Sequence, residues 1–496
     1  MRNLWCPPFR PFDPAGWSCE CCERKEFVHA KGPSGGLCAS FPFCPTATVS
    51  SCGAFRERIQ SCKVFLASMF PESGNRRCSG SAMILSICIS TMATYLGIHA
   101  GLFSLTATVT DGKQILGQVC VDYRNDLSHY FSVSTGTEDV LREVDPRIWR
   151  EALLLALQRL CEDGVALCEV SAVTGVGQGG GIVCIDACGH LTRLLAPTRH
   201  TNSNSAYCRE LENSLDERLL ARTGGKISDY DMMANIRRFL LEHPAKYACT
   251  ARFHSVSSFL CSKLIGKIEA PISLDDASRT HLLNLQERQW DAEVADRVAP
   301  GLIWKLPEPV SFHTIAGELA PLFSRYGLRP GIPVLVWNSE ISELQYCLQA
   351  TEPGIAALVL YKHISLLVSV LPTLCEVPPG SGHFMLGIRN LPTAFSIQIH
   401  DRFPDVSIAD RAKTLLQRLQ WTGVHPEKFR LMVSPMASTE AIRQLSRELM
   451  LPVEVVNLHP GSLSLSSALR ARHILNGTPI REFWPRFWQV ERVFHP

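Results

Sequence analysis

The chain has 496 residues, 46% of them hydrophobic, and its 49 basic and 47 acidic residues leave a formal net charge of +2. That length is sufficient for two or three domains, and the balanced charge, with no basic run interleaved with aromatic residues, argues against a nucleic-acid or membrane-surface partner. No apolar run reaches the roughly 18 residues that span a bilayer. The first residues lack an apolar segment of signal-peptide length, so we expect a soluble, cytoplasmic protein.

Residues 1–91 differ in composition from the rest of the chain. They hold ten of the twenty cysteines and frequent prolines, and no helical or strand period is sustained in them. The spacing of Cys19, Cys21 and Cys22 does not match a zinc knuckle, so a structural zinc module is the weaker interpretation. We expect residues 1–91 to be a weakly ordered extension and the folded protein to begin near Met92.

After Met92 the apolar pattern predicts alternating strands and helices. The Asp111-Gly112 pair favours a hairpin with a type I′ turn. A helix is predicted with Asp145 as its N-cap and Pro146 at its first position. The strands predicted in this half are Tyr95–His99, Leu105–Thr110, Lys113–Leu116, Leu167–Val173 and Ile182–Ile185. The other predicted elements are helices over Ser203–Ala221 and Asp229–Leu241, a loop at Asp275–Ser278, and a helical stretch from Trp290 to about Val298.

The glycine run Gly175–Gly181 contains the spacing Gly-x-Gly-x-x-Gly, which is typical of dinucleotide-binding folds. That motif requires a helix directly after it and an acidic residue about twenty positions later. Here a strand is predicted at Ile182–Ile185, and no acidic residue occurs between Asp186 and Glu210. We therefore expect a hairpin loop that lines a cleft.

The segment Tyr326–Glu340 is expected to connect an N-terminal domain, residues 92–325, to a C-terminal domain, residues 326–496. Its apolar part, Pro333–Val336, reads as a buried strand followed closely by the carboxylate of Glu340. The carboxyl ends of strands in open α/β sheets face the ligand crevice, so Glu340 is a candidate substrate-binding group. The alternative, which the spacing favours, is that Glu340 caps the next helix. The elements predicted beyond it are helices Ile341–Gln349, Ile408–Trp421, Thr439–Met450 and Leu463–Leu475, and strands Ala356–Tyr361, Leu366–Leu371, Phe429–Val433 and Val453–Val456.

The order of these pieces resembles the FGGY carbohydrate kinases, and most closely their xylulokinase-like members, over Met92–Asn476. The resemblance implies an α/β fold of two domains of the actin and hexokinase type, which is ribonuclease H-like, with a central cleft and a shortened C-terminal domain. The segments that carry it are Leu96–Gly101, Val144–Trp149, Thr174–Gln178, Asp275–Ser278, Ile315–Gly317, Tyr326–Pro333 and Ser434–Ser438.

The chain departs from this family at its functional motifs. In the family, an aspartate-containing turn after the first strand holds magnesium and phosphate, two further turns contact phosphate and adenosine, and an aspartate at the crossover takes the proton from the sugar hydroxyl. The resemblance places degenerate phosphate and nucleotide contacts at His99, Gly101, Lys362, His363, Ser434 and Ser438. It places sugar contacts at Gly177 and Gln178, and it puts Glu340 where the catalytic aspartate is expected.

Three functions fit this pattern. The loss of three phosphate-binding elements favours a catalytically impaired or non-catalytic relative that binds a sugar or a protein partner in the cleft. The alternative is an active kinase that uses magnesium and ATP to phosphorylate a ketose such as D-xylulose, with Glu340 as general base. The third is unrelated chemistry at His99, Lys362 and His363, for which no carboxylate stands at metal-ligand spacing, so we expect no resident metal ion. Whether ATP binds and whether the chain forms a dimer are left open.

Overall fold

The structure is a computed structural model. It describes residues 93–131, 135–137, 140–194, 196–197, 204–225, 227, 231–360, 364–371, 381–385, 395–402, 407–421, 423–433, 438–478, 482 and 484–496. The chain divides into two compact units, Met1–Ile87 and Cys88–Pro496, and every described residue belongs to the second. The prediction for residues 1–91 therefore falls outside the described residues. Among the residues described, no helix is both long and apolar enough to cross a membrane.

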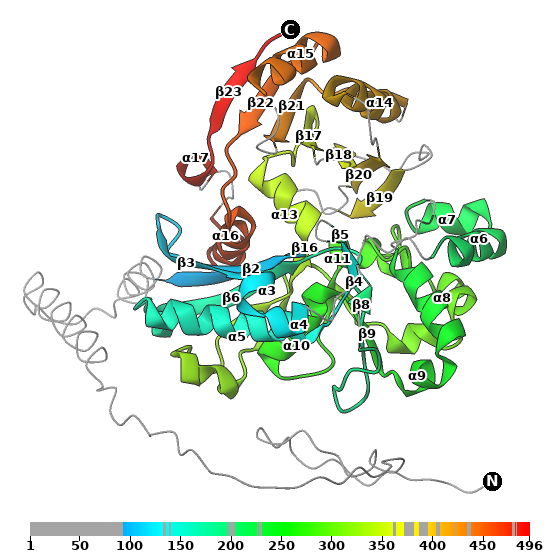
Figure 1. Ribbon diagram of the computed structural model, residues 1–496, viewed down its shortest axis with the longest axis vertical. Helices are drawn as coiled ribbons and strands as arrows, with labels where there is room; N and C mark the ends of the chain where they lie inside the picture. The colour runs from blue at the N-terminus through cyan, green and yellow to red at the C-terminus, as the bar shows by residue number, and fades with distance from the viewer. Residues whose placement is uncertain are drawn as a thin grey trace, which may run out of the picture. The chain divides into compact units, whose positions relative to one another are not determined.

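The first sheet is mixed and has the order β14-β15-β6-β1-β2-β3, with β16 also paired to β6 (Figure 1). β1, β15 and β16 run parallel to β6, whereas β2 and β3 continue from β1 as an antiparallel meander. The strands are β1 (Thr94–Ala100), β2 (Ser104–Thr110), β3 (Ile115–Asp122), β6 (Val170–Gly177), β14 (Ile315–Glu318), β15 (Pro333–Leu335) and β16 (Asn338–Ser339). β15 and β16 thus continue this sheet, and the domain boundary between residues 325 and 326 stays a prediction.

Two helices cover the first sheet, α5 (Arg147–Glu162) against β2 and β3, and α16 (Ser462–Asn476) against β1, β2 and β6 (Figure 1). α16 approaches β1 closely because Gly97 has no side chain. A Cβ atom at Gly97 would lie 1.9 Å from the backbone oxygen of Ser464. The hydroxyl groups of Thr108 and Ser464 are also hydrogen-bonded, at 2.7 Å.

The second sheet has the order β19-β20-β18-β17-β21-β22-β23. Alternate residues of β17 point to opposite cores: Ala356 and Leu358 pack with α14 and α15, whereas Ala357 and Val359 pack with α13 and α16. The helix α16 therefore packs on the first sheet and shares an apolar core with α13 and β17. The elements are β17 (Ile355–Leu360), β18 (Ile364–Leu371), β19 (Ser381–Met385), β20 (Phe395–Arg402), β21 (Lys428–Val433), β22 (Val453–Val456), β23 (Val490–Phe494), α13 (Glu340–Cys347), α14 (Ile408–Trp421), α15 (Thr439–Leu449) and α17 (Trp484–Phe487).

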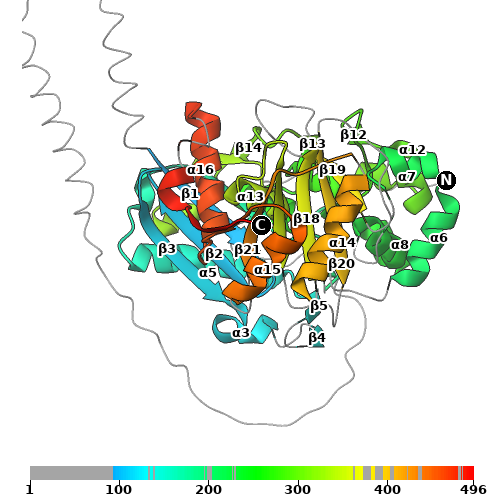
Figure 2. The ribbon, with the colours of Figure 1, turned by 90° about the horizontal axis from the view of Figure 1, so that it is seen from above.

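The chain between β6 and β14 is mainly helical, and α6, α8 and α12 share a separate apolar core (Figure 2). The helices between β6 and β14 are α6 (Ser205–Ser214), α7 (Glu217–Arg222), α8 (Met232–Glu242), α9 (Pro244–Cys249), α10 (Val256–Ile265), α11 (Leu274–Ser278) and α12 (Ala292–Val298). The short strands of the molecule are β4 (Thr135–Thr137), β5 (Val140–Val144), β7 (Val183–Ile185), β8 (Ala196–Pro197), β9 (Arg252–His254), β10 (Ile272–Ser273), β11 (Leu283–Asn284), β12 (Gln289–Trp290) and β13 (Pro309–Val310). The remaining short helices are α3 (Tyr123–Asp126), α4 (Ser128–Phe131) and the 3₁₀ turns Leu167–Glu169, Leu302–Lys305 and Pro321–Tyr326.

The predicted type I′ turn between β2 and β3 is wrong. Four residues, Asp111–Gln114, separate the strands, because the Asp111 carboxylate accepts hydrogen bonds from the backbone of Lys113 (2.7 Å) and Gln114 (2.9 Å). The start of α5 was predicted one residue too early. This helix begins at Arg147, whose backbone N–H is still bound by the Asp145 carboxylate at 2.9 Å.

The loop at the glycine run was predicted to begin too early. Gly175 and Gly177 lie in β6, and only the residues from Gln178 onward form the loop. A Cβ atom at Gly175 would lie 2.8 Å from the ring of Trp337, so glycine is needed there for packing rather than for a turn.

Two helical predictions and one loop prediction are wrong. The helix predicted over Ser203–Ala221 is broken, because Asp216 caps a new helix and accepts a hydrogen bond from the backbone of Leu219. Trp290 lies in β12 and α12 starts two residues later, after its cap Asp291. The segment Asp275–Ser278 belongs to α11 and is not a loop.

Candidate active site

Five of the predicted site residues lie at one edge of the first sheet. β1, β6 and β16 run parallel and their last residues are paired with one another. This pairing brings together His99 in β1, Gln178 directly after β6, and Glu340 directly after β16. Gly101 and Gly177 belong to the same edge. Because the carboxyl ends of parallel strands are where α/β sheets bind ligands, this edge is the candidate active site.

The centre of the edge is a contact between an imidazole and a carboxylate. His99 Nε2 lies 3.2 Å from Glu340 Oε1, and the two side chains are 17% and 19% exposed. The backbone of Gly101 passes next to the imidazole, since a Cβ atom there would lie 3.3 Å from His99 Cε1. Below it, the buried hydroxyl of Tyr123 donates to the oxygen of Gly101 at 3.3 Å. Burial, with smaller effects from nearby acidic groups that include Glu340, raises the pKa of Tyr123 well above its usual value, so this hydroxyl keeps its proton.

Gln178 offers a hydrogen-bond donor that is not used within the described part of the chain. Its side chain is buried, and its backbone N–H donates to the oxygen of Ala100 at 2.9 Å. The side-chain Nε2 has no acceptor among the described residues. Next to it, Gly177 N donates to Ser257 Oγ at 3.0 Å, and Ser257 Oγ donates to the oxygen of Asn338 at 2.9 Å. The loop is therefore held in place while its amide remains available for a ligand oxygen.

Glu340 is not the cap of the helix that follows it, so that alternative is wrong. Ser339 is the N-cap of α13, and its hydroxyl accepts a hydrogen bond from the backbone of Ser342 at 3.3 Å. Glu340 occupies the first helical position, where the positive end of the helix dipole favours a carboxylate. Its side chain is thus free of a capping role and contacts His99.

Two buried aspartates support this edge from behind. Asp275 accepts hydrogen bonds from Ser339 Oγ at 2.5 Å and Arg279 Nη2 at 3.1 Å. Asp276 accepts one from Ser255 Oγ at 2.5 Å. Burial raises the pKa of Asp276 to about 6. In the sequence, the adjacent acids Asp275 and Asp276 are the signal for this network. The sequence pattern predicts them as part of a loop and does not predict that they hold the strand before Glu340.

The remaining predicted phosphate and nucleotide residues are Lys362, His363, Ser434 and Ser438. Lys362, His363 and Ser434 lie outside the described residues. Ser438 is the exposed N-cap of α15, where its hydroxyl accepts a hydrogen bond from the backbone of Ala441 at 3.2 Å. A nucleotide-binding role for these four residues stays a prediction.

The residues at the edge do not fit a resident magnesium ion. Magnesium prefers oxygen ligands in octahedral geometry. His99 offers a nitrogen that already contacts the carboxylate of Glu340. In the described part of the chain, these two side chains are not joined by a third acidic, cysteine or histidine group close enough to complete a metal site.

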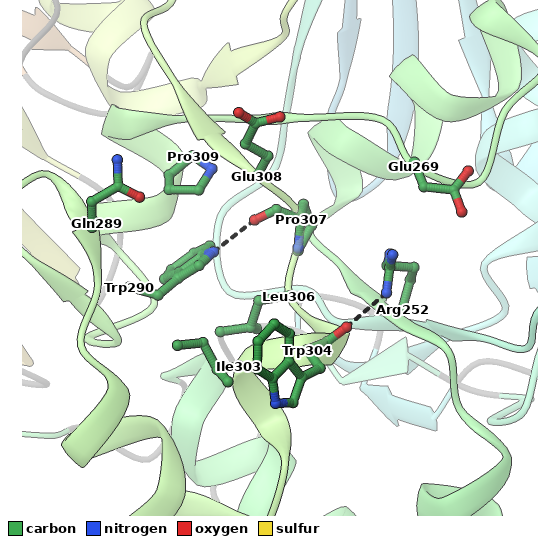
Figure 3. A pocket seen from close by; sticks show the side chains of 10 residues that line it. All are labelled: Arg252, Glu269, Gln289, Trp290, Ile303, Trp304, Leu306, Pro307, Glu308 and Pro309. Carbon is green, nitrogen blue, oxygen red and sulfur yellow. Dashed lines mark hydrogen bonds between the residues drawn. The ribbon is translucent and has the colours of Figure 1, made fainter.

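A pocket of about 490 Å³ is lined by other residues (Figure 3). Trp290 and Trp304 contribute its aromatic surface, and the indole of Trp290 is fixed by a hydrogen bond to the oxygen of Pro307 at 2.7 Å. Trp304 is 81% exposed. The other lining residues are Arg252, Glu269, Gln289, Ile303, Leu306, Glu308 and Pro309. Because none of the predicted site residues lines it, this pocket is not the candidate active site.

The sequence matches known carbohydrate kinases. Residues 95–339 match the N-terminal domain of the FGGY family of carbohydrate kinases. Xylulose kinase 2 of Arabidopsis thaliana is 27% identical over 293 residues, which cover 54% of this chain and 52% of the relative. A xylulose kinase of Rattus norvegicus is 27% identical over 217 residues, covering 39% of this chain and 40% of the relative. The chain thus spans about half, or less, of the length of the curated relatives that it matches.

Solved structures show the same fold. A xylulose kinase from Rhodospirillum rubrum superimposes with a TM-score of 0.68 at 13% identity, over 81% of this chain and 94% of that chain. A glycerol kinase from Plasmodium falciparum with ADP gives a TM-score of 0.69 at 12% identity, over 82% of this chain and 94% of that chain. These likenesses confirm the expected actin and hexokinase-like α/β fold. The match over residues 95–339, together with the xylulose kinase relatives, identifies this part of the chain as a member of the FGGY family of carbohydrate kinases.

Proposed function

We propose that the protein is a catalytically impaired member of its family that binds a sugar at the edge formed by His99, Gln178 and Glu340. The whole activity of the family, ATP-dependent phosphorylation with magnesium, is not carried over to this chain. The observation that carries the proposal is the 3.2 Å contact between His99 Nε2 and Glu340 Oε1.

This contact opposes catalysis in two ways. A general base must offer a carboxylate oxygen to the substrate hydroxyl, and an imidazole N–H that donates to Glu340 competes for that oxygen. Phosphoryl transfer also depends on neutralising charge on the phosphate oxygens. At the position where the resemblance expects the magnesium-binding carboxylate, this chain has His99. The two effects act on the same step, so we expect little or no phosphoryl transfer.

Sugar binding is supported by the polar groups that remain. Gln178 Nε2 is a buried donor without an acceptor in the described residues, and a buried donor left unpaired costs free energy. A sugar hydroxyl oxygen would satisfy it. Glu340 Oε1 and His99 Nε2 lie on the same edge and are partly exposed. A polyol would therefore meet both donors and acceptors there.

Calorimetry of the full chain with D-xylulose, and separately with magnesium-ATP, tests the proposal together with an assay of ADP release. We expect binding of D-xylulose, weak or no binding of magnesium-ATP, and no sugar-dependent ADP release. Gln178→Met should weaken D-xylulose binding about fivefold, since one net hydrogen bond is worth about 1 kcal/mol. The matched control is Gln158→Met on α5, where the amide contacts the exposed Glu162 and binding should not change. Equal D-xylulose affinity in the Gln178 variant and the wild type would contradict the sugar site.

The second candidate function is an active kinase that phosphorylates a ketose such as D-xylulose, with Glu340 as general base. It is favoured by the finding that Glu340 does not cap α13 and keeps a partly exposed carboxylate. In that case Glu340→Gln should lower sugar-dependent ADP release by about 10²–10⁴ with little change in sugar affinity, and Glu340→Asp should retain activity. If the wild type releases ADP in the presence of sugar and Glu340→Gln does not, the protein is an active kinase and the impaired-kinase proposal is wrong.

A further inference from the structure

The loop after β7 carries three side chains with metal-binding atoms. The carboxylate of Asp186, the thiol of Cys188 and the imidazole of His190 each offer one ligand atom, and these atoms all lie within 4.8 Å of one another. Among the described residues, this is the single group of three or more such side chains placed in this way. We propose that this loop binds a divalent transition-metal ion and that zinc matches it best.

The donor set points to the class of metal. Thiolate is a soft ligand, imidazole is a borderline ligand and carboxylate is a hard ligand, and zinc accepts all three in tetrahedral sites. Magnesium and calcium prefer oxygen ligands alone. Three protein ligands leave the fourth tetrahedral position for water or for a small molecule. The mixture of sulfur, nitrogen and oxygen therefore favours zinc over the hard cations.

The backbone of the loop holds the three side chains close together. Asp186 Oδ1 accepts hydrogen bonds from the backbone of Cys188 at 2.8 Å and of His190 at 2.9 Å. Gly189, with φ at +83°, donates its N–H to the oxygen of Asp186 at 3.0 Å and allows the chain to reverse. The second carboxylate oxygen, Oδ2, lies 3.4 Å from His190 Nδ1. A metal ion would thus be met by ligands that need little rearrangement.

The loop is also accessible. Cys188 is exposed, and the side chains of Asp186 and His190 are 32% and 38% exposed. Metal binding requires the thiolate, so binding at Cys188 releases the thiol proton to solvent as the sulfur–metal bond forms.

Titration of the full chain with Co²⁺, followed by its thiolate charge-transfer and d–d absorption, tests the proposal. The other cysteines of the chain give a background, so the readout is the difference between variants. The wild type is expected to bind one equivalent of Co²⁺ more than either Cys188→Ser or His190→Gln. Zn²⁺ should displace that additional equivalent of Co²⁺. The control Cys168→Ser removes another exposed cysteine and should keep it. Unchanged stoichiometry and spectrum in Cys188→Ser would overturn the proposal.

A third variant separates a metal site from a turn that only stabilises the hairpin. Asp186→Asn retains a side-chain oxygen that can accept the two backbone hydrogen bonds, because asparagine supports the same turn as aspartate, but it removes the charge. We expect at least tenfold weaker Co²⁺ binding at this equivalent, with unchanged circular dichroism. Equal affinity in Asp186→Asn and the wild type would show that Asp186 serves the turn and is not a ligand, which would overturn the three-ligand site.

Discussion

Replacing Arg470 with methionine is expected to destabilise the protein strongly. The guanidinium of Arg470, in α16, is buried and donates to Glu343 Oε2 at 3.2 Å, to Thr174 Oγ1 at 3.0 Å and to the oxygen of Gly175 at 3.1 Å. These bonds join α16 to α13 and to β6. Methionine has a similar apolar stem but no donor, so it leaves the buried carboxylate of Glu343 with the hydrogen bond from Ser466 Oγ at 2.8 Å.

The magnitude follows from the burial of the pair, whose side chains are 1% and 0% exposed. Removing one partner of a buried ion pair costs roughly 3–5 kcal/mol, because it leaves an uncompensated charge. Burial raises the pKa of Glu343, and Arg470 acts in the opposite direction, so the pKa rises further without Arg470. A carboxyl group whose folded pKa is raised contributes stability that is present at low pH and lost as the pH rises through that pKa. The loss in the free energy of unfolding caused by Arg470→Met should therefore be smaller at pH 5 than at pH 8.

Urea unfolding of the full chain at pH 5 and pH 8 measures this effect on the free energy of unfolding. The double variant Glu343→Gln, Arg470→Met removes the charge and should recover part of the loss, most clearly at pH 8. A loss below about 1 kcal/mol in Arg470→Met would show that the pair is not buried as described. A double variant that is no more stable than Arg470→Met would refute the view that the stranded carboxylate causes the cost.

Three further predictions concern stability. Gly97→Ala should cost roughly 3 kcal/mol in urea unfolding, because its Cβ atom would meet the backbone of α16, whereas Gly179→Ala, with nothing within 4 Å, should cost little; similar midpoints for the two would contradict the close packing. Because the pKa of Asp276 is raised to about 6, its contribution to the free energy of unfolding is present below about pH 4 and lost as the pH rises through 6. Asp276→Asn should flatten that part of the stability profile, and parallel profiles would exclude this origin. A chain that starts at Met92 should have the urea midpoint of the full chain, because residues 1–91 lack a periodic apolar face; aggregation or a much lower midpoint would show that they pack on the core.

The position of the candidate site could be predicted because its residues follow apolar strands. His99, Gln178 and Glu340 each stand at or just after a strand end, and parallel strands end at one edge of a sheet. Their mutual contact could not be predicted. His99 and Glu340 are 241 residues apart, and only the pairing of β16 with β6 brings the carboxylate to the imidazole.

The errors have a common cause, which is competition between local signals and tertiary contacts. Gly175 reads as a loop residue, but it lies in a strand because the ring of Trp337 fills the space beside it. Ser339 and Glu340 are both able to cap a helix, and the choice depends on which side chain reaches a free backbone N–H. Asp216 falls inside the predicted helix Ser203–Ala221. Because its side chain prefers the N-cap position, it caps the new helix α7 and the predicted helix is interrupted there.

The seating of α16 on β1 and β2 has a consequence for the order of folding. Thr108 and Ser464, which are hydrogen-bonded across this contact, are 356 residues apart. At the usual rate of synthesis, about 5–20 residues per second, the ribosome needs roughly 20–70 s to make the intervening chain. During that time the face of the sheet around Tyr95 and Ala172 lacks the helix residues that cover it, Ala468 and Ala471. Contacts so distant in the chain also form slowly after synthesis. The strands that are made first therefore stay open to aggregation and to chaperones until α16 has emerged.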